Sequence, residues 1–170
     1  MTFSRRHWLK STLAMASLAL APLRASAGQF IGFSGYRPGT IVIVTHRREL
    51  YFVLGGGRAI RYPVGVGKAG MAWHGRAHIA RKDLHPAWSP PEDIWRRHPY
   101  IPEVIPGGRS DNPMGAAAMG LDRGNYGIHG TNNPGSVGRF VSHGCIRMYN
   151  ADIRALYRMV SIGTPVVVER

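Results

Sequence analysis

Apolar and polar residues alternate in short blocks along the chain, and these blocks have the length of β-strands. Apolar runs follow one another at 40–45, 50–54 and 58–65, separated by the polar segment 46–49 and the glycines 55–57. β-branched and aromatic residues fill these runs, and glycine-rich or polar breaks of this kind are typical of tight turns. We therefore predict a three-stranded antiparallel meander, two hairpins in series.

Further along, the pattern is less regular. A weaker strand is expected at 77–80, and strands are expected at 115–121, 125–129 and 164–169. Between them, the segment 86–113 contains seven prolines and reads as irregular, with one or two helical turns over Glu92–Arg97 that have Pro91 at their first position. A long structured loop in a small domain is often part of a binding site.

One segment has the periodicity of a substantial helix, residues 150–160. Asn150 is a suitable N-cap, and Asp152 suits the positive end of the helix dipole. The apolar face follows the i, i+3, i+4, i+7 spacing, with Ile153, Leu156, Tyr157 and Val160. The predicted fold class is therefore mainly β with one substantial helix packed on the sheets.

Composition limits the alternatives. A chain of 170 residues suits one domain, and 44% apolar residues suffice for a core. The single cysteine excludes an intrachain disulfide and a cysteine-rich zinc module.

The first 27 residues have the three parts of a secretory signal: a basic head, an uncharged stretch at 11–23 and the small residues 25–27. Arg5-Arg6 within residues 4–10 resembles a twin-arginine signal. The apolar stretch is shorter than the roughly 20 residues that a membrane span needs, although an uncleaved anchor is the alternative. We predict a signal peptide at 1–27, a domain at 28–170, export to the periplasm or cell envelope, and no transmembrane anchor after processing.

Removal of residues 1–27 takes away four basic residues and no acidic one, which lowers the formal charge from +13 to +9. Such a charge favours contact with anionic envelope polymers. Nucleic acid is the usual alternative, but the predicted export and the lack of a nucleic-acid-binding motif argue against it. The basic residues are scattered, so a solvated surface also explains them.

Candidate chemistry is concentrated in residues 129–150. Cys145 follows Gly144 in a turn-like run, with His143 two residues before it and His129 sixteen residues before it. An imidazole that takes the thiol proton would make Cys145 a nucleophile, but the spacing does not decide between His129 and His143. Backbone N–H groups at Gly144 and Cys145 could stabilise an oxyanion, and Arg147 could pair with a substrate carboxylate or the thiolate.

Simpler interpretations stand beside this one. A lone cysteine is often a small buried hydrophobe, His143 could bond the backbone, and Arg147 could be an ordinary surface residue. The two histidines and the cysteine could bind zinc, but no fourth ligand is evident and the spacing is not standard, so no metal is predicted.

The run Ile128-His129-Gly130-Thr131, followed by 142–147 with the sequence SHGCIR, resembles the signature of the L,D-transpeptidases, or YkuD domains. The continuation at 150–157 is similar too, and the resemblance extends over roughly residues 39–169. It implies a β-sandwich-like catalytic domain in which Cys145 is the nucleophile, His129 the base and His143 a supporting residue. By the same resemblance, Ser142, Gly144 and Arg147 are expected to bind the substrate or to stabilise the oxyanion.

The resemblance also implies a substrate, the tetrapeptide stems of peptidoglycan, and no cofactor. The cysteine would attack the carbonyl of the L-centre of diaminopimelate, release D-alanine and pass the acyl group to an amine, a lipoprotein or water. Carbapenems should acylate the same thiol. The alternatives are a non-catalytic wall-peptide-binding protein of the same fold and a sortase-like cysteine transpeptidase.

Overall fold

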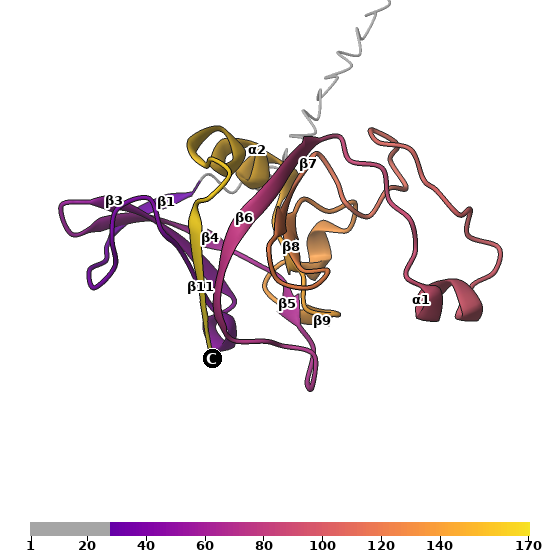
Figure 1. The fold of residues 1–170 in the computed structure, drawn as a ribbon, viewed down its shortest axis with the longest axis horizontal. Helices are drawn as coiled ribbons and strands as arrows, with labels where there is room; N and C mark the ends of the chain where they lie inside the picture. Colours follow the sequence, from indigo (N-terminus) through magenta and orange to yellow (C-terminus); the bar gives the residue numbers. More distant parts are fainter. Residues whose placement is uncertain (1–27) are drawn as a thin grey trace, which may run out of the picture.

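The computed structural model describes residues 28–170, so the predicted signal peptide at 1–27 lies outside the described residues. The fold is mostly β with one substantial helix, as predicted (Figure 1). The strands are β1 (Gln29–Gly32), β2 (Ile41–Val44), β3 (Glu49–Gly55), β4 (Arg58–Pro63), β5 (Val66–Gly67), β6 (Gly75–Leu84), β7 (Ala117–Leu121), β8 (Gly127–His129), β9 (Phe140–Ser142), β10 (Ile146–Arg147) and β11 (Pro165–Glu169). The α-helices are α1 (Glu92–Arg97) and α2 (Asn150–Met159), and single 3-10 turns occur at Thr45–Arg47 and Pro134–Ser136.

The predicted meander is confirmed: β2 pairs with β3 and β3 with β4, all antiparallel. The apolar runs are continuous because both faces of this sheet are buried. Ile41 and Ile43 enter the main core, while Val42 and Val44 enter a second cluster on the opposite face. The segment that includes β1 covers that second face and also pairs with β4. The sequence did not predict β1, since its four residues are mostly exposed and lack an apolar pattern.

Strand β6 joins the two halves of the structure. Its first residues pair with β11, which lies parallel to β2, and its later residues pair with β7. The nine-stranded sheet has the order β1-β4-β3-β2-β11-β6-β7-β8-β10, and a separate pair is formed by β5 and β9. The sequence predicted only residues 77–80 of this ten-residue strand, because beyond Ile79 its side chains are mainly polar and exposed.

Helix α2 packs against β7 and contributes Ile153 and Leu156 to the core. Lys82 of β6 lies beneath the C-terminal end of the helix, where its Nζ donates to the carbonyl of Tyr157 at 2.7 Å and to that of Val160. The end of a helix has unsatisfied carbonyls and a partial negative charge, so a lysine there stabilises it.

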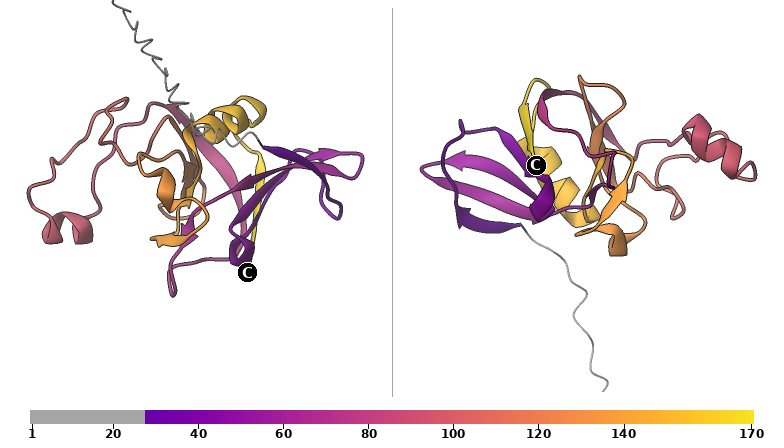
Figure 2. Two further views of the ribbon diagram at one scale, coloured as in Figure 1. Left: turned by 180° about the vertical axis from the view of Figure 1, so that it is seen from behind. Right: turned by 90° about the horizontal axis from the view of Figure 1, so that it is seen from below.

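The proline-rich stretch forms an arm that carries α1 away from the sheets (Figures 1 and 2). Asn112 fastens the base of the arm, because its Nδ2 donates to the carbonyls of Pro86, Ile105 and Pro106 at 2.9, 3.2 and 3.0 Å. Helix α1 covers Glu92–Arg97, the range predicted, and Pro91 is the N-cap residue just before it rather than its first helical residue.

The expectation that Asn150 caps α2 is wrong. Asn150 is the first helical residue, Tyr149 precedes it, and no side chain caps this end. The Asn150 Oδ1 instead accepts from the N–H groups of Ala116 at 2.9 Å and Thr131 at 3.2 Å, and its Nδ2 donates to the Thr131 carbonyl at 3.1 Å. The amide therefore joins the segment before β7 to the segment after β8, and those backbone partners take precedence over the helix end.

We predict that Asn150→Ala lowers the free energy of unfolding by about 3 kcal/mol, because it leaves several backbone groups without partners. The matched control is Asn132→Ala, which removes one exposed hydrogen bond to the Asp111 carbonyl and should cost less than about 1 kcal/mol. Urea denaturation of both variants measures the difference. Equal costs would mean that the Asn150 amide does not hold the two segments together.

Candidate active site

The pairing of β10, β8 and β7 brings two of the predicted catalytic residues, Cys145 and His129, to one side of the sheet. Strand β10 lies parallel to β8 with Arg147 opposite His129, and on the other side of β8, Ala118 of β7 is opposite His129. Cys145 lies two residues before Arg147. Side chains two positions apart on an extended chain project to the same side, so we expect Cys145 to share the face of His129.

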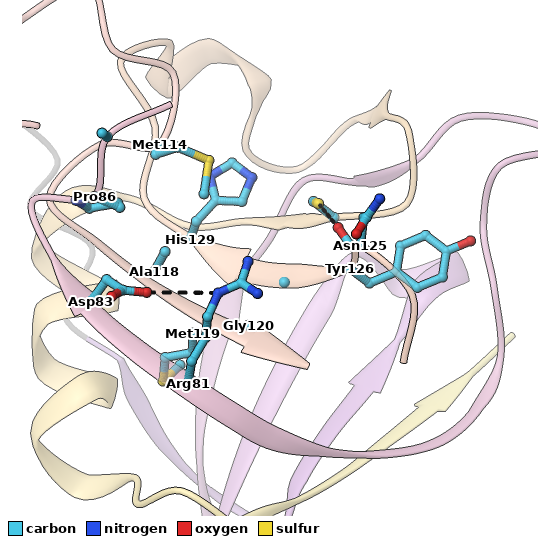
Figure 3. A pocket seen from close by; sticks show the side chains of 13 residues that line it. Arg81, Asp83, Pro86, Met114, Ala118, Met119, Gly120, Asn125, Tyr126 and His129 are labelled. Atoms are coloured by element: carbon cyan, nitrogen blue, oxygen red, sulfur yellow. Dashed lines mark hydrogen bonds and ion pairs between the residues drawn. The ribbon is translucent and has the colours of Figure 1, made fainter. Parts of the chain in front are cut away.

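A cavity of about 330 Å³ lies on this face. Gly120 and Ala118 leave space at its floor, because neither has a large side chain. It is lined by Arg81, Asp83, Pro86, Ala87, Met114, Ala118, Met119, Gly120, Asn125, Tyr126, Gly127, His129 and Cys145 (Figure 3). The base of the arm contributes part of this lining, through Pro86 and Ala87.

His129 is buried, and its ring is oriented by the backbone. Its Nδ1 lies 2.6 Å from the carbonyl oxygen of Gly130. A carbonyl only accepts, so Nδ1 carries the proton and Nε2 is left as the basic nitrogen. The pKa of His129 is lowered to about 4, mainly by burial; the Gly130 carbonyl opposes this shift, and the nearby Arg147 charge adds to it. The imidazole is therefore neutral at neutral pH.

Cys145 is partly exposed, and its Sγ lies 3.7 Å from the Asn125 carbonyl oxygen. Burial raises the pKa of the Cys145 thiol, while the Gly127 N–H and the charges of Arg147 and Arg81 lower it to a smaller extent. The resting site thus holds a neutral thiol and a neutral imidazole. A thiolate would form only when the proton moves, which makes a base necessary for nucleophilic attack.

The turn before Cys145 is fixed by Ser142. Its Oγ accepts the Gly144 N–H at 3.1 Å and donates to the Cys145 carbonyl at 2.6 Å. The Gly144 N–H, which the sequence suggested as an oxyanion donor, is therefore engaged within the turn. Gly144 has φ of +120°, which other residues rarely adopt, and a Cβ there would collide with the Tyr126 ring.

Trp73 holds the next peptide unit, the one between Gly144 and Cys145. Its Nε1 donates to the Gly144 carbonyl at 3.2 Å, and its ring stacks on Tyr126 with 5.2 Å between the ring centroids. In a trans peptide the carbonyl and the following N–H point in opposite directions. The Trp73 hydrogen bond therefore directs the Cys145 N–H away from the indole.

The structure does not bring together every predicted residue. His143 is exposed and is not part of the cavity lining. Arg147 is half-buried beside His129, burial lowers its pKa, and its Nε has no hydrogen-bond partner among residues 28–170. The sequence analysis did not indicate Arg81, Tyr126 or Trp73, because no motif in the sequence marks these positions.

Within residues 28–170, no group of three or more His, Cys, Asp or Glu side chains lies close enough to hold a metal ion. Over the same residues, no helix has the length and apolar character that a membrane crossing requires.

Comparison with known proteins gives matches over most of the described chain. Residues 38–168 match the YkuD family model, described as an L,D-transpeptidase catalytic domain. The chain is 35% identical over 136 residues to the protein named Probable L,D-transpeptidase YbiS of Escherichia coli, which covers 75% of this chain. The chain spans only 43% of that relative's length.

Two solved structures have a similar fold. An L,D-transpeptidase from Mycobacterium smegmatis superimposes with a TM-score of 0.61 at 22% identity, covering 77% of this chain and 58% of its own. A Brucella melitensis protein named Probable carnitine operon oxidoreductase CaiA has a TM-score of 0.56 at 40% identity, covering 81% of this chain and 90% of its own. The first similarity concerns the fold alone.

Burial of a neutral His129 predicts a pH-dependent stability. The unfolded chain binds this proton near pH 6.5 and the folded chain near pH 4, so the contribution is complete above pH 6.5 and is lost as the pH falls towards 4. The loss reaches about 3 kcal/mol. Urea unfolding of the wild type and His129→Gln between pH 7 and 4 tests this. The carboxylates titrate in both proteins, so the difference between the two stability curves isolates the contribution of His129. Parallel curves would contradict a buried neutral imidazole.

Proposed function

Because this chain belongs to the YkuD family of L,D-transpeptidase catalytic domains, we propose that it transfers peptidoglycan acyl groups through a thioester on Cys145. The observation that carries the proposal is that a partly exposed thiol and a buried neutral imidazole line one cavity. The proposed substrate is a tetrapeptide stem, and the carboxylates of the cell wall suit a protein with the +9 charge of residues 28–170.

In the proposed first step, His129 Nε2 takes the thiol proton while Sγ attacks the carbonyl carbon of the L-centre of diaminopimelate. The carbonyl oxygen gains the negative charge, and the Cys145 N–H stabilises it because the Gly144 N–H is already bonded to Ser142. Collapse of this intermediate breaks the bond to D-alanine, whose amine takes the proton from His129. The thioester keeps the acyl group activated, so no nucleotide is needed.

In the second step an amine attacks the thioester, His129 takes its proton, and the thiol is restored when the proton returns to Sγ. An amine of another diaminopimelate gives a cross-link, an envelope lipoprotein gives protein attachment, and water gives hydrolysis. We propose that the enzyme works in the periplasm or cell envelope after removal of residues 1–27, with the twin-arginine route as the export path. Arg147 supports the site from beside His129, and no role is proposed for His143 within the cavity.

We predict that Cys145→Ser abolishes D-alanine release from a tetrapeptide muropeptide, and that His129→Ala lowers the rate by about 10²- to 10⁴-fold. His46→Ala is the matched control, since His46 is exposed and bonds the C-terminal carbonyl of Arg170. Mass spectrometry of the products measures turnover, and urea midpoints show that the variants are folded. Turnover by Cys145→Ser would refute the thioester. Cleavage of a protein sorting signal instead would favour the sortase-like alternative, and binding without turnover the non-catalytic one.

A second prediction concerns Trp73 as a positioning residue. Trp73→Phe keeps an aromatic ring against Tyr126 but removes the hydrogen bond that orients the Gly144–Cys145 peptide. We expect the rate of Cys145 acylation by a carbapenem to fall about tenfold, because the oxyanion donor is less well placed. Alkylation of Cys145 by iodoacetamide should be unchanged, because displacement at a saturated carbon develops no oxyanion.

The matched control for this test is Trp95→Phe, which removes an equivalent hydrogen bond, 3.2 Å from the indole Nε1 to the Ile101 carbonyl, on the arm. Intact-protein mass against time gives both rates. An equal decrease in acylation and alkylation in Trp73→Phe would show that Trp73 shapes the thiol's surroundings rather than the oxyanion donor.

A further inference from the structure

Two opposite charges in the cavity have no part in the chemistry described so far. Arg81 and Asp83 occupy alternate positions of β6 and both line the cavity. The register places Arg81 opposite Gly120 and Asp83 opposite Ala118 of β7. Ala118 is in turn opposite His129 of β8. Their side chains thus lie on the cavity side of β6, whereas Lys82 between them reaches to helix α2.

The small residues of β7 determine where the Arg81 side chain lies. A Cβ on Gly120 would be 2.7 Å from the Arg81 Cγ and 2.8 Å from its Nε, so the side chain lies directly across the bare glycine. Figure 3 shows its guanidinium directed into the cavity between His129 and Tyr126, with Asp83 beside it. The charge is close enough to Cys145 to lower the pKa of that thiol.

The two charges are paired only loosely. The Arg81 Nε is 3.9 Å from the Asp83 Oδ2, which is beyond hydrogen-bond distance, and both side chains remain at least half exposed. Each group therefore keeps hydrogen-bonding capacity for a ligand: the guanidinium has five donors and the carboxylate only acceptors. A cation and an anion held side by side complement a ligand that has a carboxylate and an ammonium on neighbouring atoms.

We propose that Arg81 and Asp83 form a subsite for a free α-amino acid head group, with Arg81 binding its carboxylate and Asp83 its ammonium. This inference rests on the proposed function, in which the head group is the unreacted end of the diaminopimelate side chain. Cys145 directly precedes β10, and three strand spacings of about 4.8 Å separate β10 from β6. The Arg81 side chain, from β6, and the diaminopimelate side chain of a substrate bound at Cys145 together cover this distance. A side chain that ends in an amine alone would meet Arg81 without the compensating carboxylate.

The test compares three tetrapeptide stems. The first is the unmodified diaminopimelate stem. In the second the carboxylate at the unreacted end of the diaminopimelate side chain is amidated, and in the third the amine at that same end is acetylated. Formation of the acyl-enzyme, followed by intact-protein mass in a single turnover, isolates the first step from the choice of acceptor. We expect the wild type to prefer the unmodified stem about tenfold over each modified stem, since each modification removes one charge-assisted interaction.

Arg81→Gln should lower the rate constant at limiting substrate about tenfold for the unmodified stem and abolish the preference over the amidated stem. Asp83→Asn should do the same with respect to the acetylated stem. The control is Arg76→Gln, which removes one positive charge from the same strand outside the cavity and should keep both preferences. A general electrostatic effect on Cys145 would slow all three stems equally, and that result would overturn the subsite.

The outcomes separate this inference from the proposed function. Acylation of the wild type by all three stems at equal rates would refute the subsite and leave the transpeptidase proposal intact. If none of the stems acylates Cys145, the proposed function fails, and the subsite fails with it.

Discussion

The hydrogen bond from the His129 ring to the Gly130 carbonyl is the interaction on which the site depends. It selects the tautomer with a basic Nε2 and holds the ring in a buried position where it stays neutral. The carbonyl is in turn fixed, because Asn150 binds the backbone of the next residue, Thr131. Close packing around that amide requires glycine at 130, since a Cβ there would overlap the Asn150 side chain.

The parts of the fold that the sequence predicted are those whose apolar residues follow the pattern of a single type of element. The runs in β2–β4 and the apolar face of α2 are buried as their patterns require. The parts that were missed depend on partners distant in the sequence. Most of β6 is a strand because β7 and β11 lie on either side of it, and its exposed polar side chains conceal this. Asn150 has the residue type of a helix cap, but its side-chain amide is hydrogen-bonded to two loops that lie more than fifteen residues away in the sequence.

The same distinction applies to the site. The resemblance identified His129 and Cys145, but spacing alone could not choose between His129 and His143. The parallel pairing of β8 with β10 brings His129 to the cavity, whereas His143 is exposed, and this difference supports the proposal that His129 is the base. The contacts of Trp73, Tyr126 and Arg81 join segments that are distant in the sequence, so no local motif indicates them. The Gly144 N–H was a reasonable oxyanion donor from sequence, and only the position of the Ser142 hydroxyl removes it.

Under the proposed function, the neutrality of the resting pair also matters for a lone thiol that is exported to the cell envelope. Thiolates, rather than thiols, react with oxidants and disulfides. Burial that raises the pKa of Cys145 therefore keeps the sulfur in its less reactive form until a substrate carbonyl is present. In the proposed mechanism the cost is that nucleophilic attack needs a base at that moment, and a histidine with a pKa of about 4 is a weak one. In that mechanism, the negative charge that develops on the substrate carbonyl oxygen during the attack must then help the proton transfer. An oxyanion held at the Cys145 N–H does so, because it stabilises the imidazolium that forms beside it.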